Sequence, residues 1–439
     1  MHRAVSILAL LFSAAALGAV PAQPPQATRN VAIVGVTVVP MTGERTIEKA
    51  TVVVTDGVIS ALGAERLVPV PTGSLVVRGN GKYLVPGLAE MHAHVPGAAA
   101  PKEYRDDVLF LYVANGVTLA RGMLGAPEHL QLRTDLAAHR IVGPRLITSG
   151  PSLNGQSVKA PEQGERMVRD QKAAGYDFLK LHPGLSRDAF LAIARTAREV
   201  GIPFGGHVSA DVGVPLALAE GQATIDHLDG YLFQLVPEAD RGPSPDNMGL
   251  ALKFDPALLP RIVRATRAAG TWIVPTQTLY DNIQGPATPD ELDARPEMRY
   301  LSSQLRQQYR QRKQGVLDTK GWTPELANTF LDVRRQTIRA LHDGGARILL
   351  GSDAPQVFNV PGFSAQRELQ AMVLAGLTPY EALHAATAAP AEFFDAAGKY
   401  GTIVVGADAD FVLVGANPLQ DIGNLERIDG VMLRGRWLD

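Results

Sequence analysis

Eight apolar, strand-like segments alternate with amphipathic helical segments through the middle of this chain. Strict alternation of strand and helix is typical of βαβ units, and eight such units close a (β/α)8 TIM barrel. One helix is marked at both ends, because Ser186 can cap its first turn and Gly201 can stop its last turn. We therefore predict an α/β chain whose main domain is a barrel over residues 83–395. The predicted strands cover residues 83–91, 116–121, 145–149, 176–181, 202–206, 223–226, 271–275 and 347–351.

Both ends of the chain show a different pattern, in which β-branched residues are interrupted by turn pairs such as Asp56-Gly57. Short strands separated by Asp-Gly pairs are typical of β-hairpins. Similar material returns only near the carboxyl end, in GTIVVGADADFVLVG and DGVMLRGRWLD. We expect the two ends to pair into one small β-sandwich domain, formed by residues 23–82 and 396–439.

The composition is that of a soluble globular enzyme, with 46% apolar and 20% charged residues among 439. A formal net charge of -2 gives no reason to expect nucleic acid or an anionic membrane as a partner, since both favour basic patches. The expected partner is a small-molecule substrate, and the sequence leaves open whether the chain forms a homo-oligomer.

Residues 1–22 read as a secretory signal peptide, with Arg3 before an apolar run and small residues around Ala22, where we place the cleavage. The alternative is an uncleaved anchor, but the run is shorter than the roughly 20 residues that a spanning helix needs. The chain has no cysteine, which excludes disulfides and a lipid-modified cysteine at the cleavage site. These features predict an exported protein without an integral membrane segment after cleavage, in a bacterial periplasm or secreted.

Metal-ligating residue types follow several of the predicted strands. An HxH pair on a strand end places both imidazoles on one face, although such a pair alone is a weak signal. Barrel enzymes build their sites at the carboxyl ends of the strands, and imidazole and carboxylate are the ligands that zinc prefers. We therefore predict a metal centre where five strands converge. Its candidate ligands are His92, His94, Lys180, His207, His227 and Asp353.

The segments PGLAEMHAH, FLKLH, GGH, IDH and GSDAP, together with the tail ADADFVLV, resemble the amidohydrolase superfamily of metal-dependent hydrolases. Within it, the chain is most similar to the imidazolonepropionase-like and exported Xaa-Pro dipeptidase-like branch. The resemblance implies a distorted (β/α)8 barrel joined to a β-sandwich from both termini. It also implies two Zn2+ ions or other divalent ions. One would be held by His92, His94 and Asp353, the second by His207 and His227, and Lys180 would bridge them as a carboxylated lysine.

Lys180 decides between one metal ion and two. Burial in the apolar strand FLKL lowers the pKa of an amine, and a neutral amine can take up carbon dioxide to become an oxygen ligand. The alternative is a lysine that extends to the barrel rim, which would leave one ion bound by His92, His94, His207 and Asp353. Glu90 stands where many family members carry aspartate, and we expect this change to leave metal binding intact.

The resemblance implies hydrolysis of a C-N bond by attack of a metal-bound hydroxide, with Asp353 transferring the proton to the departing amine. The expected substrate is a dipeptide, an N-acyl amino acid or a cyclic amide. The same centre could instead hydrolyse an ester, lactone or phosphotriester. A non-catalytic ligand-binding barrel is a remote alternative, since all six ligand positions are filled.

The sequence gives weaker signals for substrate contacts and for the loops around the site. His182 and Tyr231 are candidate substrate contacts, because His182 shares a strand face with Lys180 and Tyr231 follows His227 closely. Two long connections, residues 151–161 and 279–322, follow strands and are expected to form lids or specificity loops. The remaining histidines of the mature chain are expected to pack on the barrel exterior, and they are His129, His139, His342 and His384.

Overall fold

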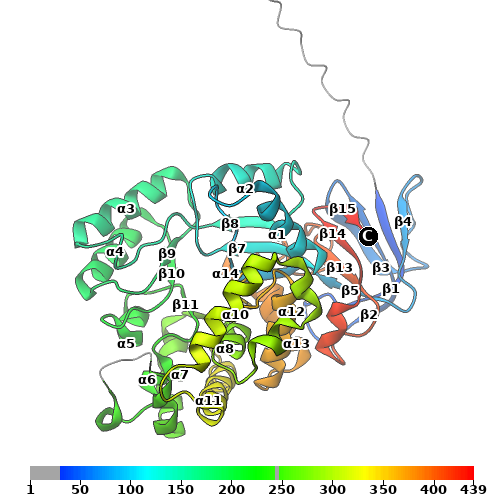
Figure 1. Ribbon diagram of the computed structural model, residues 1–439. Helices are drawn as coiled ribbons and strands as arrows, with labels where there is room; N and C mark the ends of the chain where they lie inside the picture. The colour runs from blue at the N-terminus through cyan, green and yellow to red at the C-terminus, as the bar shows by residue number, and fades with distance from the viewer. Residues whose placement is uncertain (1–29, 243–246) are drawn as a thin grey trace, which may run out of the picture.

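The computed structural model describes residues 30–242 and 247–439 and shows a barrel of strands and helices beside a sheet built from both ends of the chain (Figure 1). The predicted signal peptide, residues 1–22, lies outside the described residues. Among the described residues, no helix is both long and apolar enough to cross a membrane.

The terminal sheet confirms that the two ends of the chain pair. Its order is β15-β14-β13-β5-β1-β2-β3, with β4 on β1, and the join is the antiparallel pairing of β13 with β5. The β2–β3 hairpin turns at Asp56 and Gly57, both at positive φ, as the Asp-Gly pair predicts. Apolar side chains from both ends form one core of this sheet, and those from the amino-terminal strands are mostly β-branched. The strands are β1 (Val31–Val38), β2 (Ile47–Thr55), β3 (Val58–Ala64), β4 (Leu75–Arg78), β5 (Tyr83–Pro86), β13 (Phe411–Val414), β14 (Ile428–Leu433) and β15 (Arg436–Leu438).

The barrel consists of two parallel sheets, ordered β6-β7-β8 and β9-β10-β11-β12. Single bridges join them, from Ser149 to Phe178 on one side and from Ile273 to Ile348 on the other. The segment that follows Ile348 returns to β6 through a bridge between Ala93 and Ala354, so it occupies the eighth strand position. This ring is the predicted distorted barrel. Its strands are β6 (Leu88–Ala93), β7 (Val117–Gly122), β8 (Arg145–Thr148), β9 (Leu179–Leu181), β10 (Phe204–Gly206), β11 (Thr224–Asp226) and β12 (Trp272–Val274).

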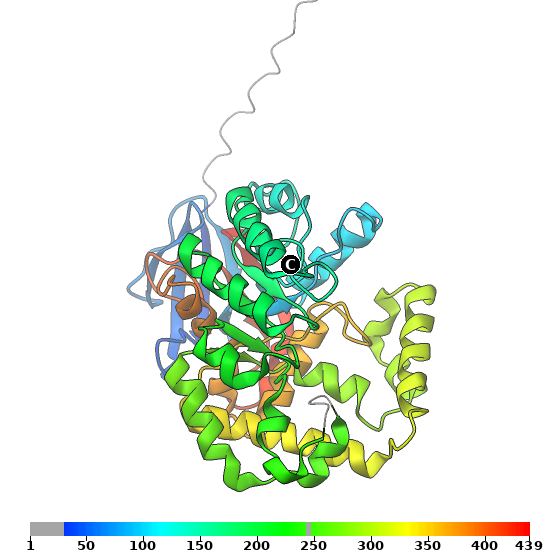
Figure 2. The ribbon, with the colours of Figure 1, turned by 90° about the vertical axis from the view of Figure 1, so that its left-hand side faces the viewer.

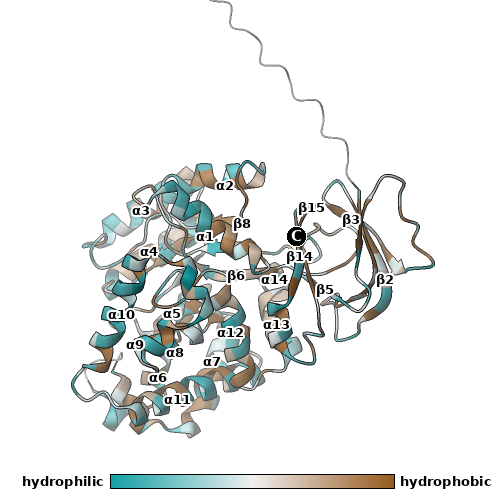
Figure 3. Ribbon diagram, turned by 45° about the vertical axis from the view of Figure 1, so that its right-hand side comes forward, coloured by the Kyte–Doolittle hydropathy of each residue, from teal (hydrophilic) through white to brown (hydrophobic). Residues whose placement is uncertain are grey.

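Helices surround these strands (Figures 1 and 2), and in Figure 3 most of them mix teal and brown, as helices with one buried face do. The helix predicted after the fourth strand is confirmed as α4 (Arg187–Val200): Ser186 caps it by accepting from the Ala189 amide, and Gly201 ends it in the left-handed conformation. The others of this ring are α1 (Lys102–Ala114), α2 (His129–Ala137), α3 (Pro161–Ala174), α5 (Gly213–Ala219), α6 (Tyr231–Gln234), α7 (Leu259–Ala269), α11 (Pro324–Asp343), α12 (Phe363–Leu374), α13 (Pro379–Ala386) and α14 (Ala388–Phe393).

Two sequence predictions differ from the structure. The first predicted strand is divided at Gly87, because residues 83–86 pair with β1 and β13 in the terminal sheet and only the rest enters the barrel. The connection over residues 279–322 is largely helical, the yellow-green segment on the right of Figure 2. It contains α8 (Gln277–Ile283), α9 (Pro289–Asp293), a 3-10 turn (Pro296–Tyr300) and α10 (Ser303–Leu317). The connection over residues 151–161, in contrast, has no helix before Pro161.

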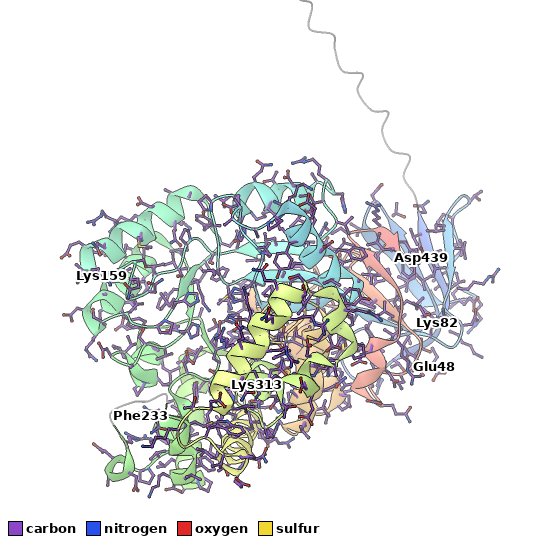
Figure 4. All side chains as sticks on the ribbon, in the orientation of Figure 1. Glu48, Lys82, Lys159, Phe233, Lys313 and Asp439 are labelled. Carbon is purple, nitrogen blue, oxygen red and sulfur yellow. The ribbon has the colours of Figure 1, made fainter. Side chains whose placement is uncertain are left out.

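Helix α10 is held in place by a buried cation. Lys313, labelled in Figure 4, donates from its amine to the carbonyl oxygens of Ile283 and Gly285 at 3.1 and 2.5 Å. Burial lowers the pKa of this amine to about 8. Residues 279–322 are polar in sequence, yet they contain a buried lysine that links α10 to the end of α8.

Candidate metal centre

His92, His94 and Asp353 form a compact group at the carboxyl ends of β6 and the eighth strand segment. The His94 Nε2 atom lies 2.6 Å from Asp353 Oδ1, and His92 Nε2 lies 3.7 Å from the same oxygen. One ligand atom from each residue lies within 4.8 Å of the others, and His92 is almost fully buried. This spacing fits the coordination of a single divalent ion.

His207 and His227 lie directly beside this group. Their rings stack with centroids 4.3 Å apart, and the His227 ring lies 4.5 Å from that of His92. The His227 Nδ1 atom is also 3.9 Å from Asp353 Oδ2. The structure thus brings the second predicted pair of histidines against the first group, as a two-ion centre requires.

Lys180 reaches the same point from β9 and is fully buried. Its Nζ atom lies 3.3 Å from His92 Nε2 and 3.8 Å from Asp226 Oδ2. Burial lowers the pKa of this amine, while Asp226 and Asp353 oppose the decrease. The alternative in which Lys180 extends to the barrel rim is therefore wrong.

Gly206 makes room for the lysine. It has φ of +120°, and a Cβ atom there would lie 2.5 Å from the Leu181 carbonyl oxygen and 2.8 Å from Lys180 Cδ. Only glycine tolerates both the conformation and the close approach. The GGH segment therefore places His207 while leaving a path for the side chain of Lys180.

Three of the histidines have their Nδ1 atoms engaged by a neighbour. Asp226 Oδ2 lies 2.8 Å from His92 Nδ1, and Asp229 Oδ2 lies 2.7 Å from His207 Nδ1. Thr276 Oγ1 lies 2.8 Å from His227 Nδ1. A partner on one ring nitrogen fixes the tautomer and turns the other nitrogen, Nε2, toward a metal. The orienting roles of Asp226 and Thr276 were not predicted from the sequence, although the acid adjacent to histidine in IDH is a signal for the first.

Glu90 ties β6 to the eighth strand segment without joining the ligand group. Its carboxylate accepts from the His92 amide at 3.0 Å, the Ser352 amide at 2.8 Å and the Ser352 hydroxyl at 2.5 Å. Complete burial raises the pKa of Glu90 to about 7, against the effect of these hydrogen bonds. One side chain thus sets the distance between His92 and Asp353.

A cavity of about 530 Å³ opens beside the histidines. His207, His227 and Asp229 line it next to the ligand group, and Tyr280 and Phe330 belong to its aromatic wall. Pockets of this volume are typical of small-molecule sites. The cavity therefore reaches the candidate centre at His207 and His227, the two candidate ligands that line it.

The two candidate substrate contacts differ in position. The His182 ring lies 5.0 Å from that of His207, and burial, with Lys180 nearby, lowers its pKa to about 2. Tyr231 lines the cavity, but its hydroxyl bonds to Thr266 Oγ1 at 2.8 Å on α7. His182 thus lies beside the candidate ligand His207, whereas the Tyr231 hydroxyl bonds to α7.

Of the four histidines expected on the exterior, His129 is fully buried. His342 and His384 pair with glutamates on the helical layer, at 3.7 Å to Glu381 and 3.6 Å to Glu392. His139 follows α2 at positive φ, outside the ligand group.

Metal-ligating side chains at the carboxyl ends of barrel strands define a class, the metal-dependent hydrolases built on a (β/α)8 barrel. The chain belongs to the amidohydrolase family, whose model matches residues 83–438. Membership makes the protein a metal-dependent enzyme that acts on C-N bonds.

Several solved structures share the fold of this chain. A protein described as a prolidase from Bifidobacterium longum has a TM-score of 0.70 at 24% identity, over 93% of this chain and 94% of its own. A Xaa-Pro dipeptidase with bound methionine has a TM-score of 0.68 at 18% identity, over 93% and 100%. A bottromycin amidohydrolase has a TM-score of 0.69 at 24% identity, over 94% and 87%. No curated protein sequence matches the chain.

Proposed function

We propose that the protein binds two divalent ions, with zinc as the first candidate, and hydrolyses the amide bond of a dipeptide or an N-acyl amino acid. The observation that carries the proposal is the orientation of three histidines: Nδ1 of His92, His207 and His227 lies 2.7–2.8 Å from Asp226, Asp229 and Thr276, respectively. Nε2 is then the ring nitrogen that each of them can offer to an ion.

The donor set fits such ions. His227 Nε2 is buried and has no hydrogen-bond partner among the described residues. A buried polar atom left unpaired costs about 1–3 kcal/mol, which a bond to a metal would remove. Neutral imidazole and carboxylate in one water-poor pocket are the ligands of a zinc site.

In the proposed ligand set, His92, His94 and Asp353 hold one ion, and His207 and His227 hold the second. Lys180, carboxylated on Nζ, would bridge the two. Its burial and its lowered pKa support this role, because carbon dioxide reacts with the neutral amine. Carboxylation would also place a negative charge among the imidazoles, which suits a site for cations.

When bound, a divalent ion lowers the pKa of water toward neutrality and polarises a carbonyl oxygen. Asp353 would accept the proton of the attacking water on a carboxylate oxygen and deliver it to the leaving amine nitrogen. Burial acts to raise the pKa of Asp353, but His92 and His94 outweigh it and lower the pKa to about 2. Its φ of +62° aims the carboxylate at both pairs of histidines.

The cavity supports a small amide as the substrate. Its apolar and aromatic wall suits a side chain of an amino acid, and its volume of about 530 Å³ exceeds what the scissile group alone needs. Two of the solved relatives are described as a prolidase and a Xaa-Pro dipeptidase, which favours a dipeptide as the first substrate to test.

We also propose that the protein is exported to a bacterial periplasm or secreted, on the basis of the signal-like residues 1–22. Expression of the full chain followed by fractionation and amino-terminal sequencing tests this proposal. Release from the cytoplasm with a new end at Gln23 supports it, and retention with the original end contradicts it.

A library of dipeptides and N-acyl amino acids, incubated with the zinc-loaded enzyme, tests the proposed activity. We expect several amides to be cleaved, and we expect Asp353→Asn to bind metal and lose most of the turnover. Hydrolysis of esters, lactones or phosphotriesters with no amide cleaved would overturn the proposal. The matched control is Glu392→Gln, a distant carboxylate that pairs with His384.

A further inference from the structure

Arg334, on α11, contacts the ends of two barrel strands at once. Its Nη1 atom donates to the carbonyl oxygen of His227 and its Nη2 atom to that of Pro275, both at 2.7 Å. Its Nε atom donates to Gln277 Oε1 at 3.0 Å. The guanidinium carbon lies over the Tyr280 ring, 3.6 Å from its centroid, in a cation–π contact.

The two carbonyl groups that Arg334 binds belong to, or directly precede, residues with strained backbone angles. His227 has φ of +65° and Thr276, which follows Pro275, has φ of +48°. Residues other than glycine keep such angles only where their surroundings enforce them. Arg334 binds the carbonyl groups at both places, and Thr276 Oγ1 in turn contacts His227 Nδ1 at 2.8 Å. The arginine therefore holds both partners of the contact that orients the His227 ring.

The cost of placing this residue here argues for a specific task. Arg334 is 6% exposed, and no carboxylate oxygen among the described residues lies within 4.0 Å of it. Burying a cation without a carboxylate in contact is costly, and packing alone would be served by an apolar side chain. Only the planar fork of arginine can reach three acceptors that come from two strand ends and a helix.

We propose that Arg334 is a positioning residue for the second metal ion. By fixing the ends of β11 and β12 relative to each other, it keeps His227 Nε2 directed at the centre. The inference rests on the proposed function, because it requires His227 to be a ligand. It adds a residue that contributes no ligand atom and that lies on a helix 107 residues away from His227.

The test compares Arg334→Met with Arg334→Lys and with Arg335→Met as the matched control. Arg335 is the next residue of the same helix and bonds instead to Asp281 and Asp332. Each purified variant is loaded with Zn2+, and the ions per chain and the affinity for each ion are measured by elemental analysis and chelator competition. Loss of a residue that orients a metal-bound histidine typically weakens metal binding 10–100-fold.

We expect Arg334→Met to retain the first ion and to bind the second about 10–100-fold more weakly, with Arg334→Lys between it and the wild type. Arg335→Met should bind both ions normally. A general loss of structure would weaken the binding of both ions, whereas the loss of a positioning residue would weaken the binding of the second ion alone.

Wild-type affinity for both ions in Arg334→Met would overturn the inference, as would equal weakening of both ions in a folded variant. If Arg334→Met does not fold, Arg334→Lys decides on the same readout, because an ammonium cannot span the three acceptors. If the wild type itself binds fewer than two ions, the proposed two-ion centre fails, and the inference fails with it. Two ions bound by Arg334→Met with the affinities of the two-ion wild type would refute the inference alone.

Discussion

Replacing Glu90 by alanine should strongly destabilise the protein, because Glu90 joins the two strand ends that carry His92 and Asp353. The side chain is fully buried and receives two backbone amides, from His92 and Ser352, together with the Ser352 hydroxyl. The hydroxyl has a second partner in Ser364 Oγ at 2.8 Å, so the alanine variant leaves two buried amides without an acceptor.

Each unpaired buried amide costs about 1–3 kcal/mol, so the two together predict a loss of about 2–6 kcal/mol in the free energy of unfolding. Glutamine at the same position keeps an acceptor for the two amides and can donate to Ser352 Oγ. We therefore expect Glu90→Gln to cost about 1 kcal/mol, the net value of an ordinary hydrogen bond. Burial raises the pKa of Glu90 to about 7, which also limits the difference between a carboxyl and an amide there.

Urea unfolding of the metal-free variants, followed by circular dichroism, measures these losses. Elemental analysis of the same proteins after loading with Zn2+ should show that Glu90→Ala loses the ion proposed to bind His92, His94 and Asp353. An alanine variant within about 0.5 kcal/mol of the wild type would refute the reasoning, since such a change is typical of surface substitutions. Equal losses in the alanine and glutamine variants would refute the role assigned to the two amides.

Three further predictions concern the surroundings of the centre. Gly206→Ala should express poorly or bind metal weakly, because the new Cβ would press on Lys180 and Leu181; normal metal content and melting temperature would contradict this. Lys180→Ala should lose metal and activity and regain part of both with short carboxylic acids; unchanged metal content would remove the carbamate bridge. Burial raises the pKa of Glu368 from 4.5 to about 8, so the Glu368 carboxyl group binds its proton more tightly in the native state than in the unfolded chain. Stability should therefore fall as the pH rises from about 4.5 to 8, and Glu368→Gln should flatten that slope in unfolding curves measured across the range; an unchanged slope would contradict the assignment.

Much of the fold could be predicted because barrel strands and their helices repeat a local pattern. The strand ends that carry His92, His207 and His227 follow apolar segments that can be recognised from the sequence alone. The ring that these segments form follows from their alternation with helices. The prediction was wrong where that signal is absent: α10 buries only Tyr309 and Lys313, so its sequence reads as a polar loop.

The orienting contacts of the centre could not be predicted because they join distant parts of the chain. Thr276 lies 49 residues from His227, and Arg334 lies 107 residues from it. No local period connects such partners, and each pairing depends on how the strand ends twist around the barrel. The six candidate ligands, in contrast, were predicted from short motifs and lie together in the structure.

Elemental analysis of the purified wild-type enzyme, combined with an amide hydrolysis assay before and after chelation, tests the central claim most directly. The account predicts about two divalent ions per chain, loss of amide cleavage when they are removed, and its return when zinc is restored. A folded, metal-free protein that cleaves the amide at the same rate would contradict it.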